Sequence, residues 1–139
     1  MPFATGLPIY FENAAGRVLE HPQGYAVFVY APGKRVLTDL QALLTHTAQL
    51  LTRRNWYRIL ADQRHMTPLT EEESKWILEY WLDPANQRPQ GIYSAILLAE
   101  DVFARLSVSQ LMQDAQAAAL TYHLFDKEPE ASAWLQKQA

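Results

Sequence analysis

The chain has 139 residues, of which 49% are apolar and 19% charged, and its formal net charge is -3. This size and composition are typical of one soluble globular domain and exclude an intrinsically disordered chain. Because cysteine is absent, disulfides, a thiol nucleophile and thiolate metal sites are excluded. Basic residues form no cluster, so we expect no nucleic-acid partner.

The apolar runs of the chain predict where it resides. Residues 1–8 contain neither a basic segment nor a long apolar run, so we expect no signal peptide. The continuous apolar stretches, such as 95–99, are all far shorter than the ~20 residues that span a bilayer. We therefore expect a cytoplasmic protein without membrane insertion.

Residues 9–30 predict an antiparallel meander of three strands. Short strand segments at 9–11 and 17–20 are joined by a turn-rich link, and a second turn precedes residue 25. Residues 25–30 are almost wholly apolar and rich in side chains that favour strands.

Residues 36–55 predict the first helix. Apolar side chains recur there at intervals of three and four residues, typical of a helix of about five turns with one buried face. Arg53 and Arg54 complement the helix dipole in the last turn, and Asn55 is suited to end it. The stripe consists of Val36, Leu40, Leu43, Leu44, Thr47, Leu50 and Leu51. A strand at 56–61 follows.

Residues 70–82 predict a second helix with a defined start. Thr70, followed three residues later by Glu73, is a capping box, and two further glutamates add favourable negative charge to the first turn. Pro84 ends the helix near residue 82.

A buried strand and a third helix are predicted next. Residues 92–99 are apolar on both faces except for Ser94, so helices should cover both sides of the sheet. Residues 101–103 predict a short helical turn, after which Ser107 caps a long helix. The apolar positions of that helix are Val108, Leu111, Met112, Ala115, Ala118 and Ala119.

The last predicted elements are a strand at 121–125 and a helix capped by Asp126, with Pro129 in its first turn. The inner face of this helix consists of Ala131, Trp134 and Leu135. The order β-β-β-α-β-α-β-α-β-α predicts an α/β fold: a mixed β-sheet that opens with an antiparallel meander and continues as alternating strands and helices, with the helices packed on the sheet. No long linker divides the chain, so we expect residues 1–139 to form a single domain.

Four motifs relate the second half of the chain to a known superfamily. They are a Trp-x-x-x-x-x-Asp strand (56–62), a Met-x-Pro-Leu-Thr loop leading into a Trp-rich helix (66–81), Ala-Glu-Asp-Val-Phe (99–103), and a Tyr-His-Leu-Phe-Asp strand before an Ala-x-x-Trp-Leu helix (122–135). With these motifs, residues 25–137 resemble small bacterial proteins of the SpoIIAA-like superfamily, which groups STAS domains with the lipid-binding CRAL-TRIO fold. The resemblance implies a SpoIIAA-like topology and a STAS-like regulatory role.

The resemblance also implies a candidate phosphorylation site. STAS domains that antagonise anti-sigma factors carry a phosphorylatable Ser or Thr at the start of the helix after this strand, and Thr70 is its counterpart. Glu71, Glu72 and Glu73 replace the small residues and glycine that follow it in the family. A phosphate would meet three carboxylates, and the hydroxyl is expected to cap the helix. These features argue against phosphorylation of Thr70.

Asp62, Arg64 and His65 follow the strand at 56–61, at the edge where open α/β sheets commonly carry functional groups. They could serve as acid/base or ligand-orienting groups. The interpretation we favour is a surface loop in which Asp62 accepts from backbone amides and Arg64 pairs with Glu72. The remaining histidines are scattered and no nucleotide-binding motif is present, so we expect no metal and no cofactor.

The aromatic helix gives a second candidate surface. Ile77 and Trp81 align one turn apart, and Trp76 and Tyr80 align likewise, one position round the helix. All four side chains could be core, or one pair could form a partner surface or the wall of an apolar pocket. We predict that Trp76 and Tyr80 contribute to a homodimer or to a contact with another protein through the helix at 70–81.

Three functions follow from these features. The first is a non-catalytic, STAS-like protein-interaction module in a bacterial cytoplasm, with residues 62–81 as its contact surface. The second is a carrier of a small apolar or lipid-like ligand, which ranks lower because a core of this size is expected to leave little room for a pocket. The third is an enzyme that uses Asp62 and His65.

Overall fold

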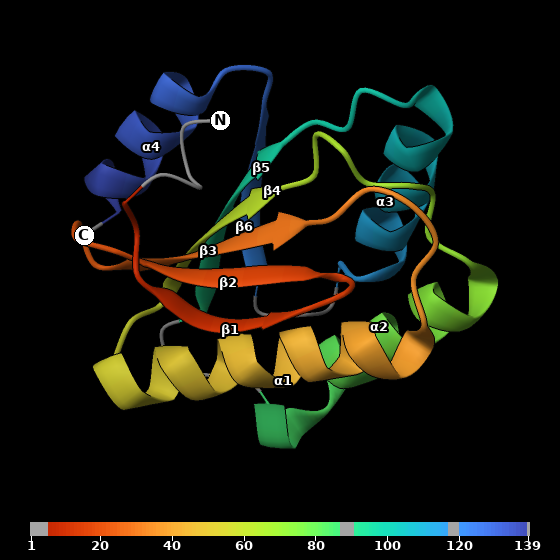
Figure 1. Ribbon diagram of the computed structural model, residues 1–139, viewed down its shortest axis with the longest axis horizontal. Helices are drawn as coiled ribbons and strands as arrows, with labels where there is room; N and C mark the ends of the chain where they lie inside the picture. The colour runs from red at the N-terminus through yellow and green to blue at the C-terminus, as the bar shows by residue number, and fades with distance from the viewer. Residues whose placement is uncertain (1–5, 87–90, 117–119, 139) are drawn as a thin grey trace.

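The computed structural model describes residues 6–86, 91–116 and 120–138. Within them the chain forms a six-stranded mixed sheet and four helices packed on it, which confirms the α/β class and the predicted order of elements. The elements are β1 (Ile9–Asn13), β2 (Gly16–His21), β3 (Tyr25–Tyr30), α1 (Leu37–Arg54), β4 (Arg58–Asp62), α2 (Glu71–Leu82), the 3-10 turn η1 (Pro84–Asn86), β5 (Ile92–Leu97), α3 (Val102–Asp114), β6 (Leu120–Phe125) and α4 (Glu128–Lys137) (Figure 1).

The strands lie in the sheet in the order of the sequence, from β1 to β6. The predicted meander is confirmed, because β1, β2 and β3 pair antiparallel. From β3 onward each pair is parallel, and each crossover between neighbouring strands contains a helix. Consecutive crossovers of the same hand stack their helices on one face of a sheet.

The sheet separates two hydrophobic cores because successive side chains of a strand point to opposite faces. The larger core joins α1, α2 and α3 to one face and includes Phe28 and Ile96. The smaller core joins α4 to the other face and includes Val27 and Leu97, the neighbours of those two residues in the chain. Figure 1 shows α4 across the sheet from α1 and α2. The expectation that helices cover both faces of β5 is confirmed.

The predicted apolar stripe of α1 is wrong at its first position. Val36 is the N-cap of α1 and its side chain is 62% exposed, whereas Leu40 and Leu43 are fully buried. The predicted end is confirmed: Asn55 adopts the left-handed conformation, with φ of 57°, and its N–H bonds back to the last turn. Asparagine tolerates that conformation better than most side chains, which explains its use there.

Two predicted helix starts are wrong. The structure has one continuous α3, in place of a short turn followed by a helix capped at Ser107. Asp101 is the N-cap and accepts from the N–H groups of Phe103 and Ala104, so the helix begins one to two turns earlier. Ser107 lies inside the helix and donates to the Ala104 carbonyl, a bond that satisfies a hydroxyl without ending a helix. The predicted positions Ala118 and Ala119 lie outside the described residues.

The start of α4 also differs from the prediction. Its N-cap is Lys127, not Asp126, and Pro129 falls in the first turn as expected. Proline has no N–H to leave unsatisfied and its φ suits a first turn, so it sets where the helix begins. The buried face of α4 consists of Ala131 and Leu135, and Trp134 is half-buried.

Candidate functional site

A cavity of about 590 Å³ lies between the sheet and helices α1, α2 and α3. Ligand pockets usually measure ~300–1,000 Å³, so the volume suits a small organic molecule. The expectation that a core of this size leaves little room for a pocket is therefore wrong. The floor consists of alternate, mostly apolar residues of neighbouring strands: Phe28, Ile59, Ala61 and Ile96.

The cavity opens at the edge of the sheet where β4 and β5 begin. Its exposed lining residues are Thr52 and Asn55 at the end of α1, and Ala85 and Asn86 in η1. This is the edge opposite to the one at which the sequence predicts functional groups. Toward the carboxyl ends of the strands the lining is buried or half-buried and includes Gln63 and Leu69.

Four buried polar side chains line the cavity, and three of them, Tyr30, Gln63 and Ser94, are each only 7% exposed. The hydroxyl groups and the side-chain amide of these three residues have no hydrogen-bond partner within residues 6–86, 91–116 and 120–138. Thr47, a fourth polar lining residue, differs because its hydroxyl donates to the Leu43 carbonyl. A buried polar group without a partner costs about 1–3 kcal/mol, so these three groups are suited to bond a bound molecule or ordered water.

Burial in the core raises the pKa of Tyr30 to about 12, with the nearby carboxylate of Glu73 adding to the shift and the Arg35 guanidinium opposing it. The Tyr30 phenol is therefore protonated at any physiological pH and can donate a hydrogen bond into the cavity. Burial likewise raises the pKa of Tyr80, which lines the cavity from α2.

The cavity lining is uncharged wherever the structure describes it. The basic residues at the end of α1, close to the mouth, have partners on the sheet: Arg54 pairs with Glu20 at 2.7 Å, and the Arg53 guanidinium lies 5.8 Å from the centroid of the Tyr10 ring. The described part of the lining therefore offers hydrogen bonds and apolar surface, and supplies no counter-charge to an ion.

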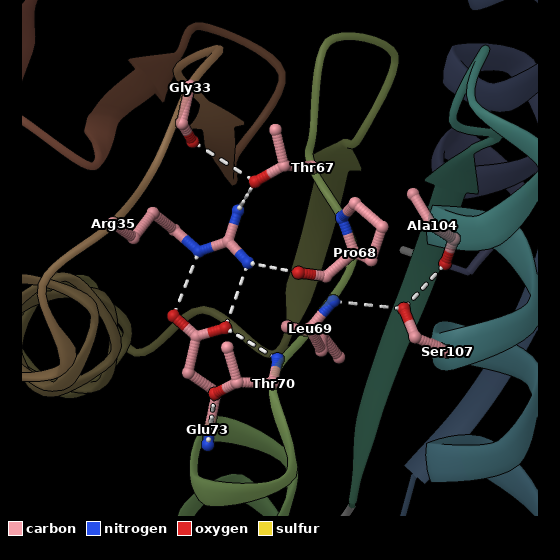
Figure 2. Close-up of polar contacts among 9 residues, drawn as sticks. All are labelled: Gly33, Arg35, Thr67, Pro68, Leu69, Thr70, Glu73, Ala104 and Ser107. Atoms are coloured by element: carbon pink, nitrogen blue, oxygen red, sulfur yellow. Dashed lines mark hydrogen bonds and ion pairs between the residues drawn. The ribbon is translucent and has the colours of Figure 1, made fainter.

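The loop between β4 and α2 forms the closed end of the cavity and is fixed by a buried ion pair (Figure 2). The guanidinium of Arg35 donates to both carboxylate oxygens of Glu73, at 2.9 and 3.1 Å. The same guanidinium donates to the Thr67 hydroxyl and the Pro68 carbonyl, each at 3.0 Å. The Thr67 hydroxyl in turn donates to the Gly33 carbonyl, which ties this loop to the one before α1.

Two further contacts hold the loop. The predicted capping box is confirmed, since the Glu73 N–H donates to the Thr70 hydroxyl and the Thr70 N–H donates to the Glu73 carboxylate, both at 3.0 Å. The Leu69 N–H donates to the Ser107 hydroxyl at 3.1 Å, which joins the loop to α3 (Figure 2). The wall that carries Leu69 is therefore anchored to the loop before α1, to α2 and to α3.

Asp62, Arg64 and His65 are not part of this cavity. Asp62 lies two residues after Leu60 on β4, so the two side chains point to the same face of the sheet. Leu60 belongs to the core on the α4 face, so Asp62 points away from the cavity. Its carboxylate accepts two hydrogen bonds from the Arg64 guanidinium, both at 2.9 Å, and one from the Arg64 N–H, as predicted for a backbone amide. The sequence predicts a pairing of Arg64 with Glu72; in the structure the Arg64 guanidinium pairs with Asp62 at 2.9 Å. His65 is exposed.

The other predicted site residues lie on α2. Thr70 is exposed, and its hydroxyl is occupied as a cap acceptor. Trp76 and Tyr80 stack with ring centroids 5.0 Å apart. Trp76 is half-buried against the larger core, and Tyr80 lines the cavity. Of the six predicted residues, only Tyr80 borders the cavity.

Sequence reasoning missed three cavity residues, Tyr30, Gln63 and Ser94. The signal for Ser94 was present, since it is the single polar side chain in an otherwise apolar strand. Tyr30 ends a strand-forming run and Gln63 stands in a polar loop, so neither departs from its surroundings in the sequence.

In the parts of the chain that the structure describes, no three His, Asp or Glu side chains are grouped so that they could hold a metal ion. Of the described helices, none has both the length and the apolar character to cross a bilayer. No model of a known protein family matches the chain, and neither a curated protein nor a solved structure shows significant similarity to it.

Proposed function

We propose that the protein is a non-catalytic binding protein whose ligand, a small and largely apolar molecule, occupies the cavity between the sheet and α1–α3. The observation that supports this most is the combination of a preformed volume of about 590 Å³ with Tyr30, Gln63 and Ser94, three buried polar groups that face it without partners in the described chain. Binding sites for small molecules typically have this composition: apolar walls and a few placed polar groups.

The geometry gives less support to the enzyme built on Asp62 and His65. A general base must reach the proton that it abstracts. The Asp62 carboxylate is instead engaged by Arg64 on the far face of the sheet from the cavity, and His65 is exposed. Ser94 lies on the cavity floor, and within the described residues neither a histidine nor a carboxylate is hydrogen-bonded to its hydroxyl.

The STAS-like interaction module and the SpoIIAA-like assignment stay predictions. Of the two binding roles that the sequence left open for the aromatic helix beside a purely core role, the wall of an apolar pocket fits Tyr80 better than a partner surface, because Tyr80 borders the cavity. The large exposed apolar side chains lie mainly on α3 and β6: Val102, Phe103, Leu106, Tyr122 and Leu124.

A fluorescence titration tests the binding function. N-phenyl-1-naphthylamine is a neutral, apolar dye that fluoresces strongly when it leaves water. Wild-type protein is expected to bind it saturably. Ala61 lies on the cavity floor, so Ala61→Phe places a ring inside the cavity and should weaken dye binding strongly while the fold, followed by circular dichroism, is retained.

Ala133→Phe is the matched control, because it adds the same ring on the exposed face of α4. It should bind the dye as the wild type does. If wild-type protein fails to bind the dye saturably, or if folded Ala61→Phe binds it unchanged, the proposed function is wrong.

A further inference from the structure

The three unpartnered polar groups occupy two levels of the cavity. Val29 of β3 pairs with Asp62 of β4, so the next residues along, Tyr30 and Gln63, lie side by side at the closed end. Ser94 of β5 pairs with Ile59, which precedes Gln63 by four residues. At about 3.3 Å per residue, the two levels are roughly 13 Å apart along the sheet.

The floor between these levels is apolar. Ala61 and Ile96 are paired neighbours on β4 and β5, and both line the cavity between Ser94 and Gln63. A molecule that satisfies both levels must therefore have an apolar middle and a hydrogen-bonding group toward each end.

The polar groups at both levels suit neutral ligand groups. The phenol of Tyr30 stays protonated and donates, while the amide of Gln63 and the hydroxyl of Ser94 each can donate and accept. Such groups match hydroxyl, carbonyl, ester or amide functions.

A charged ligand group would find no counter-charge among the described lining residues. The described lining contains no Asp, Glu, Lys, Arg or His. The charges of Arg35 and Glu73, which lie near Tyr30, pair with each other at 2.9 Å. Moving an ion from water into such a site without a paired charge is strongly unfavourable.

Resting on the binding function proposed above, we infer that the ligand is an uncharged molecule with two polar ends: one end meets Tyr30 and Gln63 at the closed end of the cavity, and the other meets Ser94 nearer the mouth.

The test is displacement of bound N-phenyl-1-naphthylamine by three probes of equal chain length: decane-1,10-diol, decanedioate and decane-1,10-diammonium. At neutral pH the diol should displace the dye from wild-type protein. Each charged probe should bind roughly a hundredfold more weakly, because its ends lose water without gaining a counter-charge. Comparable displacement by either ion would overturn the inference, and so would failure of the diol to displace a dye that binds.

Two variants test the anchors. Ser94→Ala and Gln63→Met should each weaken diol binding, relative to dye binding by the same variant, roughly three- to tenfold, the effect of one lost neutral hydrogen bond. Ser109→Ala removes an exposed serine of α3 that does not line this cavity and should change nothing. Unchanged diol affinity in both anchor variants would refute the two-anchor arrangement. If the wild-type protein does not bind the dye at all, in contrast, the proposed function itself is refuted.

Discussion

Arg35→Met is the most informative change at the closed end of the cavity. The Arg35 and Glu73 side chains are only 2% and 3% exposed, and the guanidinium makes four hydrogen bonds to Glu73, Thr67 and Pro68. Methionine keeps the apolar stem and removes the charge, so the Glu73 carboxylate would stay buried without its counter-ion.

Removal of one partner from a buried ion pair costs about 3–5 kcal/mol in free energy of unfolding. At a urea m-value of about 1.5 kcal/mol per molar, the midpoint of urea denaturation should fall by roughly 2–3 M. The double variant Arg35→Met/Glu73→Gln should recover a large part of this loss. The introduced glutamine side chain is uncharged, and its amide oxygen can still accept from the Thr70 N–H.

The pH dependence supplies a second readout. Burial alone would raise the pKa of Glu73, but hydrogen bonds from Arg35 and from the Thr70 N–H, with the Arg35 charge, hold it below its ordinary value. A lowered pKa stabilises the fold above the unfolded-state pKa, and this stability is lost as the pH falls. Without Arg35, burial dominates and raises the pKa, so the stability of Arg35→Met should be lost as the pH rises. The difference in free energy of unfolding between the wild type and Arg35→Met should therefore become smaller from neutral pH toward about pH 4.

Arg17→Met is the matched control, because Arg17 pairs with Glu12 at 2.7 Å and the two side chains are 40% and 46% exposed. It should cost less than about 1 kcal/mol, as exposed ion pairs do. A cost for Arg35→Met as small as that of Arg17→Met, or a double variant no more stable than the single one, would refute the role of the buried pair.

Three further predictions concern α2 and Tyr30. Thr70→Ala should lower the free energy of unfolding by about 0.5–2 kcal/mol, because the Glu73 N–H loses its acceptor, and an unchanged denaturation midpoint would contradict the cap. In a spectrophotometric titration, the difference in absorbance between the wild type and Tyr30→Phe should show no tyrosinate signal below pH ~11, since burial raises the pKa of Tyr30 to about 12. If α2 mediates association, folded Trp76→Ala should elute as a smaller species than the wild type in size-exclusion chromatography; an unaltered oligomeric state and partner binding would rule this out.

Much of the fold could be predicted because its signals are local. The capping box at Thr70 involves residues three apart, and the stripe of α1 repeats within one helix. Errors arose where two residues could serve as a cap. Asp101 and Ser107 are both good N-cap residues, and the choice between them depends on how α3 packs against the rest of the molecule.

The cavity could not be predicted because it depends on contacts between residues far apart in the sequence. Tyr30 and Gln63 become neighbours only through the register of β3 and β4. The ion pair of Arg35 with Glu73 joins residues 38 positions apart. The space left between α1–α3 and the sheet depends on how three helices sit together, which the apolar pattern of any one helix does not specify.

A crystal structure of the protein with decane-1,10-diol would show directly whether and how the cavity binds such a molecule. We predict one diol molecule between the sheet and α1–α3, with one hydroxyl bonded to Tyr30 or Gln63 and the other to Ser94. A cavity that holds only ordered water in the presence of saturating diol, or a diol bound elsewhere on the surface, would contradict this prediction.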